Sequence, residues 1–505
     1  MPLLPSLSTL AAAAVAGPAA CAGLATPHGD VTVTRAEFVQ PAPAWVPAGH
    51  GPYAPVPVKV PLCRVEGTIE GTIGFELWLP VQWNGRLLGA GVGGDAGVFN
   101  YRDMSIRVAQ GFATVTTDAG HKAAAPRWMA DPKANIDYQH RAVHLTTQAA
   151  KQLVARHFGR PAQRSYYLGC SGGGRQALKE MQNYPADYDG VVAGAPGPYM
   201  PLQSVRMLWF SLEQQRQPEA ALRDADWSLY ERRVHEACDP VDGRRDGVIE
   251  NPARCRFDTR QLLCKPGQGE GCLTAPRLAM LDRIVAPMVD EQGRAMDGGL
   301  FAGVRTRPGP PSPLLRAMWA DGVHNDPDWD AMTFRRSADL AAANQAMPEL
   351  RADRTAIQPF VRRGGKAILY QGWQDPSTNA GPTIDYYARL ARANGGLARL
   401  DDAVRLFMVP GMYHCRGGPG ADLFGGSGDE TATGDAAGDV LWALIRWVEQ
   451  GQAPASLEAR KIGADGAASP ARTLCAFPAS ARPQPGAAAT RFTCRTDPML
   501  SRMMR

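Results

Sequence analysis

Residues 166–175 read Tyr-Tyr-Leu-Gly-Cys-Ser-Gly-Gly-Gly-Arg, a G-x-S-x-G pattern between an apolar run at 166–169 and a helical pattern at 174–183. Small residues beside Ser171 allow the sharp strand-to-helix turn that exposes a reactive hydroxyl at the edge of a sheet. The bare pattern also occurs in ordinary glycine-rich turns. The strand–turn–helix context favours Ser171 as a nucleophile.

A serine nucleophile needs a basic histidine that is oriented by a carboxylate. In α/β-hydrolases the three residues follow the order serine, acid, histidine along the chain. The acid is expected after a late strand, and Asp375 follows the apolar run 366–370. Asp385 and the pair 401–402 lie nearby, but in an expected helix and loop, so we expect Asp375 to be the acid.

The base is expected after the next strand, and His414 follows the apolar run 404–409. Of the nine histidines, His414 is the only one downstream of Asp375. Cys170 precedes Ser171 directly, and Cys415 follows His414 directly. If the serine and the histidine lie within hydrogen-bond reach, a disulfide between these neighbours is plausible and would tie the base to the nucleophile.

Short apolar runs before and after Ser171 alternate with helical patterns, which predicts an α/β fold with a mostly parallel sheet. The apolar runs are 75–79, 86–90, 112–117, 166–169, 190–193, 366–370 and 404–409, and further helical patterns lie at about 138–158, 383–393 and 440–449. The alternation stops after 190–193 and resumes at 366–370. We expect an α/β-hydrolase domain built from residues 21–199 and 361–505, with a lid domain inserted at 200–360. Since 505 residues exceed what one core usually supports, more than one folding unit is expected.

Composition excludes several classes of protein. The net charge is +5, and the basic residues are scattered, which argues against nucleic-acid binding. Hydrophobic residues make up 45% and charged residues 20%, so the chain is not a disordered protein. The sequence shows no run that is long and apolar enough to span a membrane, and it sets no oligomeric state.

The N-terminus and the cysteines indicate a compartment. Residues 1–20 resemble a signal peptide with an Ala-Val-Ala cleavage site at 14–16, although no basic residue precedes the apolar stretch. Ten cysteines without any C-x₂-C pair favour disulfides over zinc, and hence a secreted or periplasmic protein. Cys21 could also be a lipoprotein acceptor, but Pro18 stands where an apolar residue is usual, so we expect a disulfide instead.

The expected lid carries an acidic loop. Asp239, Asp242 and Asp246 fall within eight residues, among glycines that allow tight turns. Hard oxygen ligands on a compact loop suit Ca²⁺, although the spacing is not that of an EF-hand. On spacing alone, a solvated acidic turn is the more common explanation.

Several motifs together resemble the tannase and feruloyl esterase family, which also includes mono(2-hydroxyethyl) terephthalate hydrolases. The similar segments are Gly-Cys-Ser-Gly-Gly-Gly-Arg at 169–175, Tyr-Pro at 184–185, 188–196, Trp-Asn-Gly-Arg at 83–86, Thr-Asp-Ala-Gly-His at 117–121 and Pro-Gly-Met-Tyr-His-Cys at 410–415. The resemblance runs from about Cys21 to Cys494. It implies an α/β-hydrolase with a large lid, and a structural role for His121.

The resemblance also implies roles for individual residues. Ser171, Asp375 and His414 correspond to the catalytic triad, and the backbone N–H groups of Gly94 and Gly172 to the oxyanion hole. The implied disulfides are Cys21–Cys63, Cys170–Cys415, Cys238–Cys255, Cys264–Cys272 and Cys475–Cys494. The implied structural Ca²⁺ is held by the side chains of Asp239, Asp242 and Asp246 and by the carbonyls of Arg244 and Val248.

These observations predict a secreted serine esterase that acts on a small aromatic ester and uses no redox or nucleotide cofactor. A feruloyl ester is the expected substrate. A galloyl ester and a terephthalate monoester remain open, because all three share a flat aromatic acyl group. A catalytically inactive binding protein on the same fold is a further alternative, although the serine, the acid and the histidine are all present.

Overall fold

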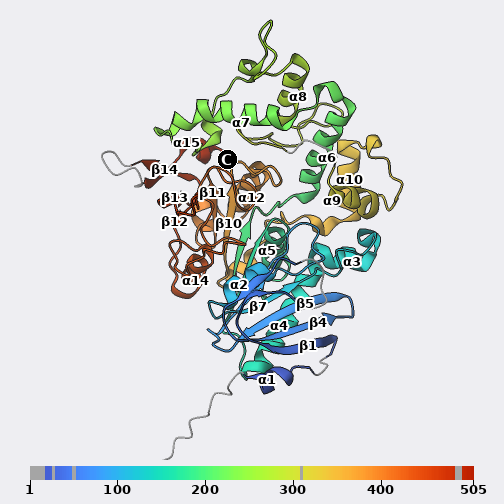
Figure 1. Cartoon of the computed structure of the whole chain (residues 1–505), viewed down its shortest axis with the longest axis vertical. Coiled ribbons are helices and arrows are strands. Elements are labelled where there is room, and N and C mark those ends of the chain that lie inside the picture. Colours follow the sequence, from blue (N-terminus) through green and yellow to red (C-terminus); the bar gives the residue numbers. More distant parts are fainter. Residues whose placement is uncertain (1–16, 26–28, 48–52, 307–310, 484–491) are drawn as a thin grey trace, which may run out of the picture.

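The computed structural model describes residues 17–25, 29–47, 53–306, 311–483 and 492–505. A nine-stranded sheet forms its centre, in the order β1-β4-β5-β7-β6-β8-β9-β10-β11 (Figure 1). The strands are β1 Val31–Val39, β4 Leu62–Ile69, β5 Ile73–Pro80, β7 Ala113–Thr117, β6 Arg86–Ala90, β8 Arg164–Cys170, β9 Gly190–Gly194, β10 Lys366–Gly372 and β11 Val404–Val409. From β7 to β11 neighbouring strands are parallel, whereas β1, β4, β5 and β7 pair in antiparallel fashion.

The central strands are apolar on both faces because helices cover both. Tyr166 and Leu168 of β8 pack in one core with Leu444 of helix α14 (Val440–Gln450). Tyr167, the residue between them, packs in another core with Leu178 of α5 (Gly172–Asn183). This alternation explains why the sequence shows continuous apolar runs in place of a strict polar–apolar pattern.

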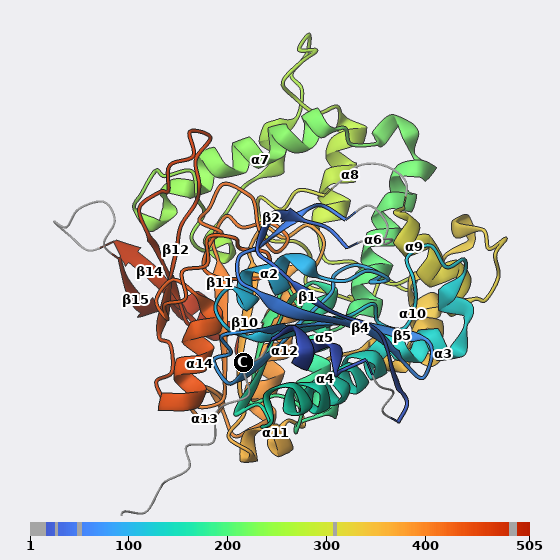
Figure 2. The same cartoon turned by 60° about the horizontal axis from the view of Figure 1, so that its bottom comes forward.

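The two helical layers are visible when the molecule is tilted (Figure 2). One layer contains α4 (Ala142–Phe158), α5 and α12 (Ala380–Ala393), and the other contains α2 (Tyr101–Val108) and α14. Shorter helices are α1 Pro18–Ala22, α3 Pro132–Ile136, α13 Leu397–Leu400 and α15 Pro498–Arg502. The expected helix at 138–158 begins as a π-helical turn at Asp137–Arg141 and continues as α4.

A long insertion separates β9 from β10, although these two strands are neighbours in the sheet. We use the name insertion for residues 200–360, which lie above one end of the sheet and are coloured green to gold in Figure 1. Its helices are α6 Met200–Arg216, α7 Asp224–Cys238, α8 Ala275–Val285, α9 Pro313–Ala317 and α10 Arg336–Ala346. Helix α11 (Gln358–Arg362) marks the return to the catalytic domain, because its Phe360 packs with Leu369 and Leu390. Trp227 and Trp319 are fully buried within the insertion, in a core that continues into the catalytic domain around Phe75 and Trp128.

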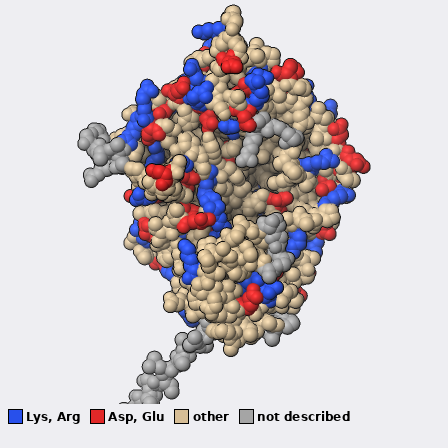
Figure 3. Space-filling model, viewed as in Figure 1, with Lys and Arg blue, Asp and Glu red and all other residues tan. Residues whose placement is uncertain are grey.

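Three small hairpin-like pairs complete the structure. They are β2 Ala42–Trp45 with β3 Val56–Val58, β12 Ser456–Ala459 with β13 Arg472–Cys475, and β14 Ala479–Pro483 with β15 Phe492–Thr496. These strands are short and lie outside the main sheet, so their sequences carry little periodic signal. Lys, Arg, Asp and Glu side chains are interspersed over the face seen in Figure 3, which is hollowed below the insertion.

Candidate active site

Ser171 lies between the end of β8 and the start of α5, as the sequence predicts. Its backbone has φ 59° and ψ −123°, a strained conformation for a residue with a side chain. A Cβ atom at Gly169 would lie 2.5 Å from the Gly173 carbonyl oxygen, and one at Gly174 would lie 2.1 Å from that of Gly194. Glycine is therefore required on both sides of this turn.

Asp375 and His414 form the second part of the site. Asp375 follows β10 and is fully buried, and its Oδ2 lies 2.8 Å from His414 Nδ1. The N–H groups of Ser377 and Thr378 donate to Asp375 Oδ1 at 2.8 and 2.9 Å, and the Thr378 hydroxyl donates to Oδ2 at 2.7 Å. These donors stabilise the carboxylate form and hold it toward the imidazole.

The three alternative acids face elsewhere, and Asp402 is exposed. Asp385 forms an ion pair with Arg389 on the exposed side of α12, and Asp401 accepts a hydrogen bond from the Tyr387 hydroxyl. Thr378 was not singled out from the sequence, yet it donates to the acid and lies 3.4 Å from His414 Nδ1. Its position three residues after an aspartate at a strand end is the signal that could have revealed it, because such aspartates form local turns with the residues that follow.

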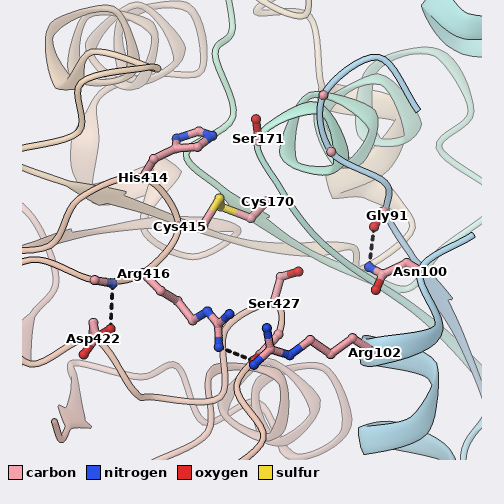
Figure 4. Close-up of a pocket in the computed structure, with 14 residues that line it drawn as sticks. Gly91, Asn100, Arg102, Cys170, Ser171, His414, Cys415, Arg416, Asp422 and Ser427 are labelled. Atoms are coloured by element: carbon pink, nitrogen blue, oxygen red, sulfur yellow. Dashed lines mark hydrogen bonds between the residues drawn. A yellow bond between two sulfur atoms is a disulfide. The ribbon is translucent and has the colours of Figure 1, made fainter. Parts of the chain in front are cut away.

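The disulfide Cys170–Cys415 connects the serine turn with the histidine loop, with 6.0 Å between the two Cα atoms. Ser171 and His414 line the same two cavities, and Figure 4 shows both side chains above this disulfide on the same side of the pocket. The remaining four bridges also form as the resemblance implies: Cys21–Cys63, Cys238–Cys255, Cys264–Cys272 and Cys475–Cys494.

The loop 91–94 packs against the N-terminus of α5. A Cβ atom at Gly172 would lie 3.0 Å from the Val92 carbonyl oxygen and 3.2 Å from that of Gly94. The Tyr138 hydroxyl donates to the Gly94 carbonyl at 3.0 Å, and φ at Gly94 is +60°. The expected oxyanion donors Gly94 and Gly172 therefore lie next to each other and both line the cavity at Ser171.

His121 is buried near this loop and stacks on Trp128, with 3.5 Å between the ring centroids. Burial lowers the pKa of His121 to about 4, so the ring is neutral at pH 7. A neutral, stacked ring agrees with the structural role that the resemblance implies.

Two cavities of different chemistry meet at Ser171 and His414. The apolar pocket has a volume of about 340 Å³ and lies under the insertion. Its apolar walls are Pro196, Met200, Met207, Leu314, Leu315 and Met318. Trp319 and Trp329 are aromatic residues of the insertion, but they are not among the residues that line this pocket. Both are buried in the hydrophobic core.

The polar pocket has a volume of about 710 Å³ and lies on the side of the catalytic domain. Its polar side chains, drawn in Figure 4, are Asn100, Arg102, Arg416, Asp422 and Ser427. None of the residues that the structure places in its wall belongs to the insertion. The sequence did not point to these residues, since they come from two distant segments that only the fold brings together.

The acidic loop of the insertion follows α7, with Asp239–Asp242 in a 3₁₀ turn. The N–H groups of Asp246 and Gly247 donate to Asp239, and Arg472 forms an ion pair with Asp246 at 2.8 Å. Asp242 Oδ2 is buried and has no hydrogen-bond partner among the described residues. Burial raises the pKa of Asp242, and the charges of Asp246 and Asp239 raise it further.

An unsatisfied buried carboxylate oxygen in a loop of oxygen donors fits a hard cation. In the described part of the chain, however, no three His, Cys, Asp or Glu side chains gather closely enough to hold a metal ion by themselves. The carbonyls of Arg244 and Val248 would therefore have to supply part of the ligand set.

Comparison with known proteins identifies the family. The family model described as tannase and feruloyl esterase matches residues 58–313 and 312–492. The chain belongs to the tannase and feruloyl esterase family. It is therefore a carboxylic ester hydrolase, and the fold is that of the α/β-hydrolases.

Individual members of the tannase and feruloyl esterase family are similar over most of the chain. A probable feruloyl esterase B-2 from Neosartorya fischeri is 33% identical over 441 residues, 83% of each chain. The crystal structure of an esterase from Aspergillus oryzae has a TM-score of 0.89 at 30% identity and covers 95% of this chain and 100% of its own. The crystal structure of feruloyl esterase B from Aspergillus oryzae has the same TM-score and coverage at 27% identity.

The expected leader and its cleavage site fall mostly outside the described residues, which begin at 17. Cys21 is in α1 and forms a disulfide with Cys63, as expected in place of a lipid anchor. Within the described ranges no helix is long and apolar enough to cross a membrane.

Proposed function

We propose that this chain is a serine esterase that hydrolyses esters of aromatic acids, with feruloyl esters as its preferred substrates. The observation that carries the proposal is the apolar pocket, which opens directly beside Ser171 and His414. Three of its walls are methionine side chains, whose thioethers make favourable contacts with aromatic rings. The names of the similar feruloyl esterases support the same substrate class.

In this proposal Ser171 is the nucleophile. His414 takes the proton from the serine hydroxyl as the bond to the ester carbonyl forms, and Asp375 holds the imidazole in the tautomer with a proton on Nδ1. The N–H groups of Gly94 and Gly172 receive the negative charge on the carbonyl oxygen. His414 then gives its proton to the departing alcohol, and the same residues activate water to release the aromatic acid.

The pocket also favours feruloyl esters over the two alternatives. Gln203 and Ser204 are its neutral polar side chains on α6, and the Gln203 amide nitrogen is buried without a partner among the described residues. One donor of this kind suits the single hydroxyl and the methoxy group of a feruloyl ring. The three hydroxyls of a galloyl ring would lose more hydration than these walls return. Arg175 also lines the pocket, but its two terminal amino groups donate to the carbonyl oxygens of Gln139 and Tyr138, which leaves the carboxylate of a terephthalate monoester without a bidentate partner.

The test is hydrolysis of methyl ferulate, methyl gallate and mono(2-hydroxyethyl) terephthalate by the purified protein. We expect the highest kcat/KM for methyl ferulate and loss of all turnover in Ser171→Ala. A protein that binds methyl ferulate without hydrolysing it would be an inactive binding protein. A highest kcat/KM for one of the other two esters would instead contradict the feruloyl preference.

The acidic loop is proposed to hold a structural Ca²⁺ through Asp239, Asp242 and Asp246 and the carbonyls of Arg244 and Val248. The ion would neutralise carboxylates that now repel one another, and it takes no part in ester cleavage. Support comes from the unsatisfied Asp242 Oδ2 and from the oxygen-only donor set.

Secretion or a periplasmic location is proposed from the five disulfides, because such bonds persist in oxidising compartments. Mass spectrometry of the mature protein would test this, with a chain that begins after about residue 16–20 and no lipid on Cys21 as the expected result. A retained N-terminus in a cytoplasmic fraction with free thiols would contradict it.

A further inference from the structure

The polar pocket lies on the opposite side of the reacting groups from the apolar pocket. The two cavities share Gly94, Ser171 and His414, but one is walled by the insertion and the other by the catalytic domain. An ester whose carbonyl carbon lies at Ser171 has to extend both ways from that point. If the aromatic acyl group fills the apolar pocket, the alcohol extends into the polar pocket, where His414 protonates it.

Arg416 is the unpaired charge of the polar pocket. Its guanidinium donates to the Gly428 carbonyl oxygen and, among the described residues, forms no ion pair with a carboxylate. Asp422 is the acidic residue that the structure places in the wall of this pocket. Its carboxylate already accepts a hydrogen bond from the Gly417 N–H at 2.7 Å and contacts Lys461 Nζ at 3.3 Å. A half-buried guanidinium without a counter-charge is a ready partner for an anion.

Arg102 lies beside Arg416. A Cβ atom at Gly428 would lie 3.4 Å from Arg416 Cζ and 3.6 Å from Arg102 Cδ, so both side chains flank the same glycine. Figure 4 shows the two guanidinium groups close together below the Cys170–Cys415 disulfide. Arg102 also pairs with Glu430 at 2.8 Å, but that pair is largely exposed and therefore only partly neutralises the local charge.

The neighbouring carboxylate Asp103 does not compensate for Arg416. It accepts hydrogen bonds from the Ser427 hydroxyl and the Gly428 N–H, and the Asn100 amide donates to it at 2.8 Å. These contacts fix the floor of the pocket. The guanidinium groups of Arg102 and Arg416 line the end of the pocket away from His414, beyond the Cys170–Cys415 disulfide (Figure 4).

We propose that the polar pocket binds the alcohol part of the substrate and selects alcohols that carry a carboxylate, with Arg416 as the main anion-binding residue and Arg102 in support. The inference rests on the proposed function, since it needs an aromatic ester cleaved at Ser171. A volume of about 710 Å³ is large enough for a cyclic hydroxy acid. The substrate class is therefore an aromatic acid esterified to a hydroxy acid.

Two matched esters test the proposal. The first is the feruloyl ester of trans-4-hydroxycyclohexanecarboxylic acid, and the second is the same ester with a carboxamide in place of the carboxylate. They share the acyl group, the ring and the size, and differ only in the charge on the alcohol. Methyl ferulate serves as the reference for the underlying esterase activity.

We expect the parent enzyme to prefer the carboxylate ester by about tenfold or more in kcat/KM at low ionic strength, and the preference to shrink at high salt because exposed charges are screened. Arg416→Gln should bring the ratio of the two kcat/KM values to about one, and Arg416→Lys should retain part of it. Arg102→Gln should lower the ratio only about two- to threefold. Arg260→Gln, whose arginine pairs with Asp258 on the exposed surface of the insertion, is the control and should leave the ratio unchanged.

Because both esters need the same catalytic groups, the ratio is insensitive to any displacement of His414 that a change at position 416 causes. A parent that cleaves methyl ferulate but does not distinguish the two esters would overturn this inference and leave the proposed function standing. A preference that persists in Arg416→Gln would overturn the role of Arg416. A parent that cleaves none of the three esters would overturn the proposed function itself.

Discussion

The catalytic domain and the insertion hold their functional residues in different ways. Ser171, Asp375 and His414 each follow a parallel strand at its carboxyl end, where strand pairing fixes the backbone. Met207 and Leu315 come from helices of the insertion, which has no strand in the main sheet. The sheet therefore positions the catalytic groups, and under the proposed function the insertion determines which acyl group fits beside them.

The two regions also differ in how well their carboxylates are satisfied. Asp375 accepts hydrogen bonds on both oxygens from neighbouring residues, and its position needs no further partner. Asp242 in the insertion keeps one buried oxygen without a partner among the described residues. Changes in the catalytic domain should thus alter turnover of every ester, and changes in the insertion should alter selectivity or stability.

The largest effect is expected for Asp375→Asn. The asparagine amide cannot hold His414 in the tautomer with a proton on Nδ1, so kcat should fall by about 10³–10⁴-fold. The fall should be equal for p-nitrophenyl ferulate and p-nitrophenyl acetate, because it concerns the base and not the acyl pocket. Asp385→Asn, a change on the exposed side of α12, is the control and should keep the parental rate. A loss confined to the ferulate ester would contradict the assignment.

The next effect concerns the Cys170–Cys415 bridge. It joins residues 245 positions apart, so the chain-entropy model gives a loss of about 5 kcal/mol in the free energy of unfolding when both cysteines become alanine. We also expect kcat to fall by about tenfold or more at temperatures where circular dichroism shows a folded protein, because the histidine loop loses its connection to Ser171.

Removal of the Cys264–Cys272 bridge in the insertion is the matched comparison. It joins residues only 8 positions apart, so the expected loss is about 2.5 kcal/mol, with kcat unchanged. Equal kcat values for both double variants would mean that the Cys170–Cys415 bridge stabilises the fold without positioning the base.

A smaller effect is expected in the apolar pocket. Met207→Ala removes apolar contact with the acyl ring, and a loss of about 1–1.5 kcal/mol corresponds to roughly a five- to tenfold lower kcat/KM. The loss should appear for p-nitrophenyl ferulate and not for p-nitrophenyl acetate, which share the same alcohol. Met332→Ala, at an exposed methionine of the insertion, is the control. A parallel loss for both esters would place Met207 outside the acyl site.

The smallest effect on activity is expected for the acidic loop. Chelation should lower the melting temperature by a few degrees, and added Ca²⁺ should restore it, since a ligand at a hundredfold excess over Kd stabilises by about 2.7 kcal/mol. Asp242→Ala should melt like the chelated parent and no longer respond to Ca²⁺. Turnover at 25 °C should stay at the parental value. An Asp242→Ala variant that melts like the untreated parent would exclude a structural metal at this loop.

Much of the catalytic domain can be predicted from the sequence. The runs at 75–79, 86–90, 166–169, 190–193, 366–370 and 404–409 all lie within observed strands, and the run at 112–117 matches β7, which begins one residue later at Ala113. Their buried apolar runs are long and bounded by turn residues, so local pattern is sufficient to find them. The strands β1 and β4 and the pairs outside the main sheet were missed. β1 is half-exposed and the pairs are short, whereas β4 is buried but carries Arg64 and Glu66, which interrupt its apolar run.

The sequence by itself determined the nucleophile turn, the strand ends that carry the acid and the base, and the cysteines that flank the serine and the histidine. Each of these features lies within one short segment of the chain. Only the tertiary structure decided which side chains form the pockets. The apolar walls of α6 and α9 come to Ser171 because the insertion folds back over the sheet. Arg102 and Arg416 are more than 300 positions apart and become neighbours only through packing. Local pattern records what a segment requires of its own backbone, whereas a cavity depends on contacts between distant segments that no single segment encodes.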